Sequence, residues 1–150
     1  MDIRSVPRSR RNPQFNQELL PISLRKAGIA YQAVPALGGL RRTRPNSANT
    51  GWRNASFRGY ADYMQTPEFE QGLEQLLGLA RQSPTAIMCA EAVPWRCHRS
   101  LVADALVARG VQVQHILSQH RAQPHSLTPF AVLRGKHISY PEPGAPHVIQ

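Results

Sequence analysis

The chain has 150 residues, 41% of them hydrophobic, and this length suits one domain with one hydrophobic core. No apolar run approaches the roughly 20 residues that cross a membrane, and no signal peptide is visible, so we expect a cytoplasmic protein without a membrane partner. Eighteen lysine and arginine residues against nine acidic ones give a net charge of +9, which favours an anionic partner. An arginine-rich codon usage would give the same excess of positive charge. The positions of the arginines, rather than their number, therefore have to indicate whether an anion binds.

The first half of the chain predicts short strands that alternate with a helix and loops. Residues 2–6 form the first strand candidate, and a basic loop bracketed by prolines follows over residues 7–15. A helix is expected over residues 21–27, with proline at its first position, and a second strand over residues 29–34. The polar stretch 37–57 has no regular pattern, and a loop of this length is typical of a functional or disordered segment.

The second half predicts a capped helix and then a strand–helix–strand unit. Thr66 suits the N-cap of a helix over residues 67–81, whose apolar residues recur with helical spacing. A short buried strand over residues 85–88, a helix over 101–109 and a strand over 111–116 then form a βαβ unit. In such units the loop that leaves the first strand usually meets the ligand.

Together these elements predict a Rossmann-like, three-layer α/β domain with a mostly parallel sheet over residues 1–140. Residues 130–140 predict a C-terminal β-hairpin around Arg134 and Gly135. Residues 141–150 are rich in proline and predict a disordered tail.

Several motifs occur in order along the chain: Ser5-x-Pro7-x-Ser9-Arg10, Leu37-Gly38-Gly39, Phe57-Arg58-Gly59-Tyr60-Ala61-Asp62-Tyr63-Met64, and Cys89-Ala90-Glu91 with Cys97-His98-Arg99-Ser100. They resemble the bacterial family named domain of unknown function 488, and the resemblance implies an α/β fold without an established activity. Members usually open with a strand of Thr-Ile-Gly-His type and a helix, which are missing before the segment 2–4. The resemblance therefore implies a truncated form or a start placed too late, and the unpaired sheet edge predicts a poorly soluble or oligomeric chain.

The loop after residues 85–88 carries the residues best suited to catalysis. Cys89 is the candidate nucleophile, because helix amides and nearby positive charge can stabilise its thiolate. Glu91 is the candidate general base or acid. Six residues separate Cys89 from Arg96, whereas five separate the corresponding pair of cysteine-dependent phosphatases. A buried cysteine that acts as a small apolar residue is the alternative.

Basic and polar residues predict an anion-binding pocket beside this loop. Residues 96–100 precede a helix and can present amides, an imidazole and guanidinium groups to one anion. The candidates are Arg8, Arg10, Arg11, Asn12, Arg53, Asn54, Arg58, Arg96, His98, Arg99 and Ser100. For any single arginine, a solvated surface position is the alternative.

Cys89, Cys97 and His98 offer three metal ligands with a spacing unlike that of known metal sites, so no metal and no cofactor is expected. The sequence therefore predicts a protein that binds a small anionic ligand containing phosphate, such as a nucleotide, with catalysis left open. A basic accessory protein that binds nucleic acid is the alternative, and an inactive fragment is a third reading.

Overall fold

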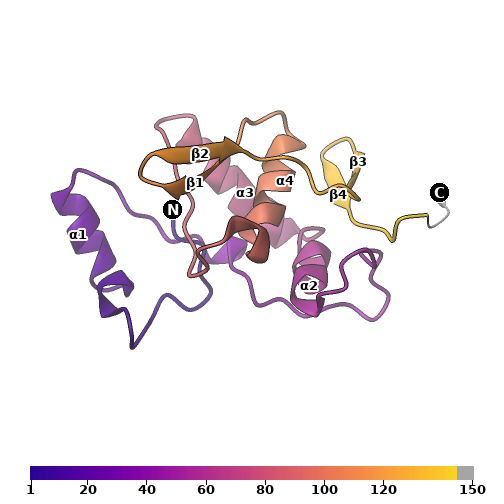
Figure 1. The fold of residues 1–150 in the computed structure, drawn as a ribbon, viewed down its shortest axis with the longest axis horizontal. Coiled ribbons are helices and arrows are strands. Elements are labelled where there is room, and N and C mark those ends of the chain that lie inside the picture. Colours follow the sequence, from indigo (N-terminus) through magenta and orange to yellow (C-terminus); the bar gives the residue numbers. More distant parts are fainter. Residues whose placement is uncertain (145–150) are drawn as a thin grey trace.

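The computed structural model describes residues 1–144 and consists mainly of helices and connecting segments (Figure 1). The α-helices are α1 (Leu20–Lys26), α2 (Ala55–Tyr63), α3 (Pro67–Ala80) and α4 (Arg99–Val107). The strands are β1 (Gln114–Ser118), β2 (Arg121–Pro124), β3 (Val132–Arg134) and β4 (His137–Ser139). The strands form two separate antiparallel pairs, β1 with β2 and β3 with β4.

The predicted Rossmann-like, three-layer domain with a mostly parallel sheet is wrong. The described residues form two small antiparallel sheets, and the expected parallel strands meet only in two isolated bridges, Asp2 with Ala33 and Asp2 with Met88. Pro7 and Pro35 follow two of these segments closely, and proline has no amide hydrogen with which to extend a ladder. The segment expected as the last parallel strand, residues 111–116, contributes its end to β1 and pairs with β2 instead.

Helix α3 begins where the sequence predicts. The Thr66 hydroxyl accepts a hydrogen bond from the Phe69 amide at 3.3 Å, and Pro67 occupies the first helical position. The apolar stripe of α3 faces inward, since Phe69, Leu73, Leu76 and Leu77 are all buried. Burial of this face is the main contribution of α3 to the core.

The core joins α2, α3 and α4 to the bridged segments of the N-terminal half. In Figure 1, α3 and α4 lie at the centre of the molecule, whereas α1 lies at one end. The largest fully buried core side chains are Ile3, Val34, Leu37, Tyr60, Phe69, Leu73, Leu101, Val102 and Tyr140. Ile3 and Val34, which neighbour the bridged residues Asp2 and Ala33, are buried in this core. Their burial stabilises the isolated bridges although no strand extends from them.

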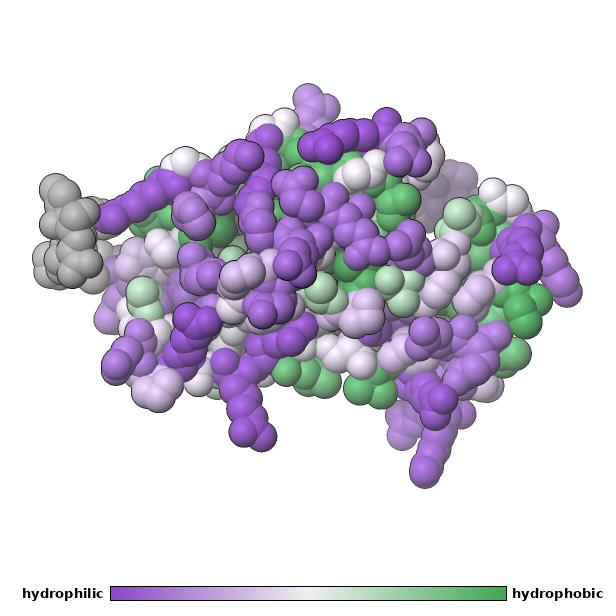
Figure 2. All heavy atoms as spheres, turned by 180° about the vertical axis from the view of Figure 1, so that it is seen from behind, coloured by the Kyte–Doolittle hydropathy of each residue, from purple (hydrophilic) through white to green (hydrophobic). Residues whose placement is uncertain are grey.

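The C-terminal hairpin is present, as predicted. Strands β3 and β4 are antiparallel, and Gly135 between them has a φ of +60°, a conformation that favours glycine. The predicted tail, residues 141–150, falls mainly outside the described residues. Among the described helices, none combines the length and apolar character of a membrane span. Hydrophilic side chains cover much of the face seen in Figure 2.

Candidate functional site

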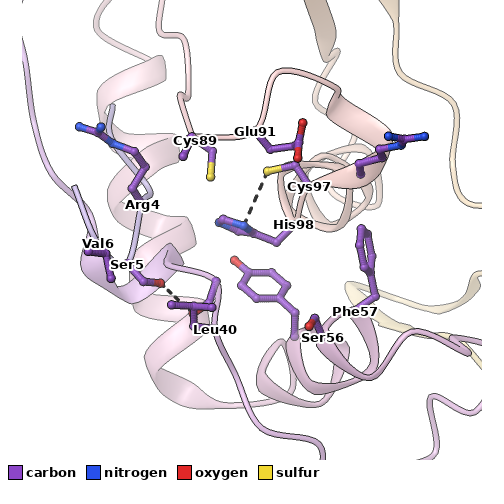
Figure 3. Close-up of a pocket in the computed structure, with 14 residues that line it drawn as sticks. Arg4, Ser5, Val6, Leu40, Ser56, Phe57, Cys89, Glu91, Cys97 and His98 are labelled. Atoms are coloured by element: carbon purple, nitrogen blue, oxygen red, sulfur yellow. Dashed lines mark hydrogen bonds between the residues drawn. The ribbon is translucent and has the colours of Figure 1, made fainter. Parts of the chain in front are cut away.

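A cavity of about 420 Å³ opens beside the loop that follows Met88 (Figure 3). Four stretches of the chain line it: the segment after the Asp2 bridges, the turn at Gly39 and Leu40, the first turns of α2, and the loop after Met88 itself. Its lining residues are Arg4, Ser5, Val6, Gly39, Leu40, Ser56, Phe57, Tyr60, Cys89, Ala90, Glu91, Arg96, Cys97 and His98. Both cysteines of the chain therefore line the same cavity.

Two thiols and one imidazole meet at the cavity wall. The sulfur atoms of Cys89 and Cys97 and a ring nitrogen of His98 all lie within 4.8 Å of one another. Cys97 is buried and its Sγ lies 3.7 Å from His98 Nδ1, whereas Cys89 is only half-buried. Figure 3 shows both sulfur atoms and the imidazole ring turned toward the same point.

Three neighbours fix the orientation of the His98 ring. Its Nε2 lies 3.2 Å from the carbonyl oxygen of Ile3, and a carbonyl only accepts, so Nε2 carries a proton and Nδ1 faces the sulfurs. The ring also packs on Tyr60, with centroids 4.8 Å apart. A Cβ on Gly39 would lie 2.9 Å from Nδ1, so the absence of a side chain there lets the ring occupy its position.

The two thiols share their protons unequally. A hydrogen bond from Cys97 lowers the pKa of Cys89 to about 4 against the opposing effect of burial, and His98 and the Glu91 amide add to the shift. The same bond, with burial, raises the pKa of Cys97. Arg99 donates to Cys97 Sγ through Nε at 3.4 Å and its amide at 3.5 Å, which lowers the pKa of Cys97 by less than Cys89 and burial raise it. The negative charge therefore resides on Cys89, at the cavity wall.

Arg99 and Ser100 build the loop rather than the cavity surface. The Arg99 guanidinium donates to the carbonyl oxygens of Glu91 and Ala92, and so it closes the loop between the two cysteines. The buried Ser100 hydroxyl donates to the Cys97 carbonyl at 2.9 Å. Both side chains were predicted to bind an anion, and both have backbone partners here.

The structure brings Cys89, Glu91, Arg96 and His98 together and places the other predicted residues elsewhere. Glu91 and Arg96 are exposed at the cavity. The rest lie outside the cavity lining: Arg8 (paired with Glu18 at 2.8 Å), Arg10, Arg11, Asn12, Arg53, Asn54 (the N-cap of α2), Arg58 (Nε to the Trp52 carbonyl at 2.9 Å), Arg99 and Ser100.

Arg4 lines the cavity, and sequence reasoning missed it. Its guanidinium forms a two-point ion pair with Asp2, with Nη2 2.6 Å from Oδ2 and Nε 2.9 Å from Oδ1. The Tyr31 hydroxyl donates to the same carboxylate at 2.6 Å. Burial raises the pKa of Asp2, but these hydrogen bonds outweigh it, and the net pKa is lowered. The positive charge of Arg4 is thus already compensated beside the cavity.

A second polar cluster surrounds Asp104, in the middle of α4. The carboxylate is fully buried and accepts four hydrogen bonds: from His125 Nε2 (2.8 Å), the Thr128 amide (3.0 Å), the Thr128 hydroxyl (2.7 Å) and the Tyr140 hydroxyl (2.9 Å). His115 Nε2 lies 2.8 Å from His125 Nδ1 and extends the chain of contacts. The signal in the sequence was an aspartate amid the apolar residues of a predicted helix, which sequence reasoning did not use.

Comparison with known proteins supplies a family and no activity. A family model described as "Domain of unknown function DUF488" matches residues 1–106, which include the cavity and the loop with both cysteines. No curated protein and no solved structure matches the chain significantly.

Proposed function

This chain belongs to the DUF488 family, and we propose that it binds a small anionic ligand in the Cys89 cavity and acts on it with the Cys89 thiolate as nucleophile. The observation that carries the proposal is the meeting of two thiols and one imidazole at the wall of a cavity of about 420 Å³. This volume lies in the range of small-molecule sites. Cys89 is the half-buried member of the pair, so its sulfur is the one that a ligand reaches.

The neighbours of Cys89 suit nucleophilic attack. Its sulfur supplies the electron pair for a new bond to an electrophilic carbon of the ligand, whose leaving group departs with the electrons of the broken bond. Cys97 Sγ lies within 4.8 Å of the Cys89 sulfur, and its thiol lowers the pKa of Cys89. His98 Nδ1 faces the same point, with its ring held by Ile3 and Gly39.

Arg96 is the guanidinium that suits an anionic group of the ligand. Its side chain is exposed at the cavity and makes no hydrogen bond to a side chain or backbone atom within residues 1–144. Arg4, by contrast, is engaged by Asp2. The net charge of +9 also favours the approach of an anion. A carboxylate or phosphate at Arg96 would leave the remainder of the ligand beside Cys89.

Alkylation by iodoacetamide, located by peptide mass spectrometry, tests the nucleophile. In the reduced, chelator-treated protein we expect modification of Cys89 well before Cys97, and loss of the rapid reaction in the Cys89→Ser variant. Equal slow labelling of both cysteines would contradict the assignment, because it would mean that neither sulfur is both ionised and accessible.

Protection from alkylation tests the ligand. We expect a nucleotide or phosphosugar from a screening set to slow the labelling of Cys89 saturably, and Arg96→Gln to weaken the protection. Arg53→Gln, an exposed arginine outside the cavity lining, serves as the matched control and should leave it unchanged. Oligonucleotide binding that falls steeply with salt and survives Arg96→Gln would favour the nucleic-acid alternative instead.

A further inference from the structure

We infer that Cys89, Cys97 and His98 form a binding site for a thiophilic divalent cation, Zn²⁺ above all, with an open coordination position toward the cavity. This inference goes beyond the proposed function, because a metal site at these residues requires no reaction at Cys89. It also runs against the sequence-based expectation that no metal binds, which depended on spacing and ligand number.

The geometry of the three atoms fits tetrahedral zinc. With Zn–S near 2.3 Å and Zn–N near 2.05 Å, tetrahedral angles place a sulfur and a nitrogen ligand about 3.6 Å apart. The distance from Cys97 Sγ to His98 Nδ1 is 3.7 Å, and the Cys89 sulfur lies within 4.8 Å of both atoms. In tetrahedral zinc the three atoms would be corners about 3.6–3.8 Å apart, so the Cys89 sulfur has to come closer by roughly 1 Å at most.

The surroundings of the ligands also match a metal site. A histidine that binds a metal usually donates its other ring N–H to a carbonyl or carboxylate, and His98 Nε2 already faces the Ile3 carbonyl at 3.2 Å. Arg99 directs its amide and Nε at Cys97 Sγ, which stabilises a thiolate there once a cation has replaced the shared proton. The chain therefore presents Nδ1 and two sulfurs, and it holds the supporting groups in place.

The charges and the number of ligands point to an open site. Two thiolates and a neutral imidazole balance the two positive charges of Zn²⁺. Glu91 and Arg96 lie at the cavity, but no carboxylate belongs to the close cluster within the described residues. The fourth position is therefore left for water or for a ligand in the cavity, as in zinc sites with three protein ligands.

The local structure of the loop between the two cysteines explains why their spacing in the sequence did not indicate a metal site. The 3₁₀ turn Pro94–Arg96 returns the chain to the starting point of the loop, and Arg99 closes it by hydrogen bonds to Glu91 and Ala92. Seven intervening residues thus bring Cys97 back beside Cys89. Because a cation would occupy the Cys89 sulfur, metal binding and alkylation exclude each other.

Titration of the reduced, chelator-stripped full chain with Co²⁺ alone tests the site. We expect one equivalent to give the thiolate-to-cobalt charge-transfer band and the visible d–d bands of tetrahedral coordination. Zn²⁺ should displace Co²⁺ and protect Cys89 from iodoacetamide. Absence of the charge-transfer band, or its appearance without protection of Cys89, would overturn the inference.

Matched variants separate the site from adventitious binding. Cys89→Ser and His98→Gln should each weaken Co²⁺ binding on the order of 100-fold or more, since even outer partners of a metal change affinity 10- to 100-fold. His120→Gln, an exposed histidine in the turn between β1 and β2, should bind Co²⁺ unchanged. Equal affinity in Cys89→Ser and the unchanged protein would refute the site, whereas slow alkylation of the stripped protein would refute only the nucleophile.

Discussion

Replacement of Asp104 by asparagine should strongly destabilise the protein, although the two side chains have nearly the same shape. The carboxylate is 0% exposed and accepts four hydrogen bonds, two on each oxygen. In the asparagine variant an amide nitrogen replaces one carboxylate oxygen. Its hydrogens then point at groups that donate hydrogen bonds to the carboxylate in the unchanged protein. On Oδ1 these are His125 Nε2 and the Thr128 amide, and only the hydroxyls on Oδ2 can rotate to accept.

The magnitude follows from these contacts. Loss of one partner of a buried, hydrogen-bonded charge costs about 3–5 kcal/mol, and we expect Asp104→Asn to fall in that range. With a urea m-value of about 2 kcal/mol/M, the midpoint of unfolding should fall by roughly 1.5–2.5 M. Glu74→Gln, an exposed carboxylate on α3, is the control and should change stability by less than about 0.5 kcal/mol. If the two variants unfold at the same urea concentration, Asp104 does not stabilise the contact between α4 and the C-terminal segments.

Three further predictions concern backbone packing and protonation. Gly78→Ala should stabilise α3 by about 0.5–1 kcal/mol in urea unfolding because its Cβ meets nothing within 4 Å, whereas Gly59→Ala should destabilise because its Cβ would lie 2.3 Å from the Arg41 carbonyl oxygen. Burial, with the charges of His125 and Arg99, lowers the pKa of His115, so the folded state binds fewer protons than the unfolded state. The contribution of neutral His115 to the free energy of unfolding is therefore full above about pH 6.5 and is lost as the pH falls through the folded pKa. Between pH 7.5 and 5, the melting temperature of His115→Gln should fall less than that of the unchanged protein. In the presence of chelator, the alkylation rate of Cys89 should reach half its maximum near pH 4, since the pKa is lowered to about 4, rather than near 8.5 as for a free thiol.

Helices α1, α3 and α4 could be predicted from the sequence because their signals are local, whereas the start of α2 was assigned to the irregular stretch 37–57. The cap at Thr66, the proline at position 67 and the apolar stripe from Phe69 each specify part of α3 without reference to the rest of the chain. The pairing of the strands could not be predicted in this way, because a short apolar run contains no local signal for the segment with which it pairs. Asp2 forms one isolated parallel bridge with Ala33 and another with Met88. The strand pairing does not continue beyond these bridges, so no sheet forms.

The candidate site was found in part, for a similar reason. Cys89 and Cys97 stand out by residue type, and the turn that joins them is local in the chain. Arg4 lies 85 residues before Cys89 and enters the cavity through the Asp2 bridges, so its position depends on tertiary structure. The arginines of the N-terminal loop were expected at the cavity only because a parallel sheet would have placed both loops at one edge. Without that sheet, the expectation loses its geometric basis.

The two proposals for the cavity are coupled through its charge. Without a cation, the Cys89 thiolate and Glu91 offset part of the attraction that the exposed Arg96 guanidinium offers to an anionic ligand. With Zn²⁺ on two thiolates and His98, the metal site is neutral and offers an open position to a carboxylate or phosphate. The metal and the anion should therefore strengthen each other's binding by the same factor, as linkage requires. A Co²⁺ affinity that rises with added inorganic phosphate in the unchanged protein, and rises less in Arg96→Gln, would establish that coupling; an affinity unchanged by phosphate in both would show that the anion does not reach the metal.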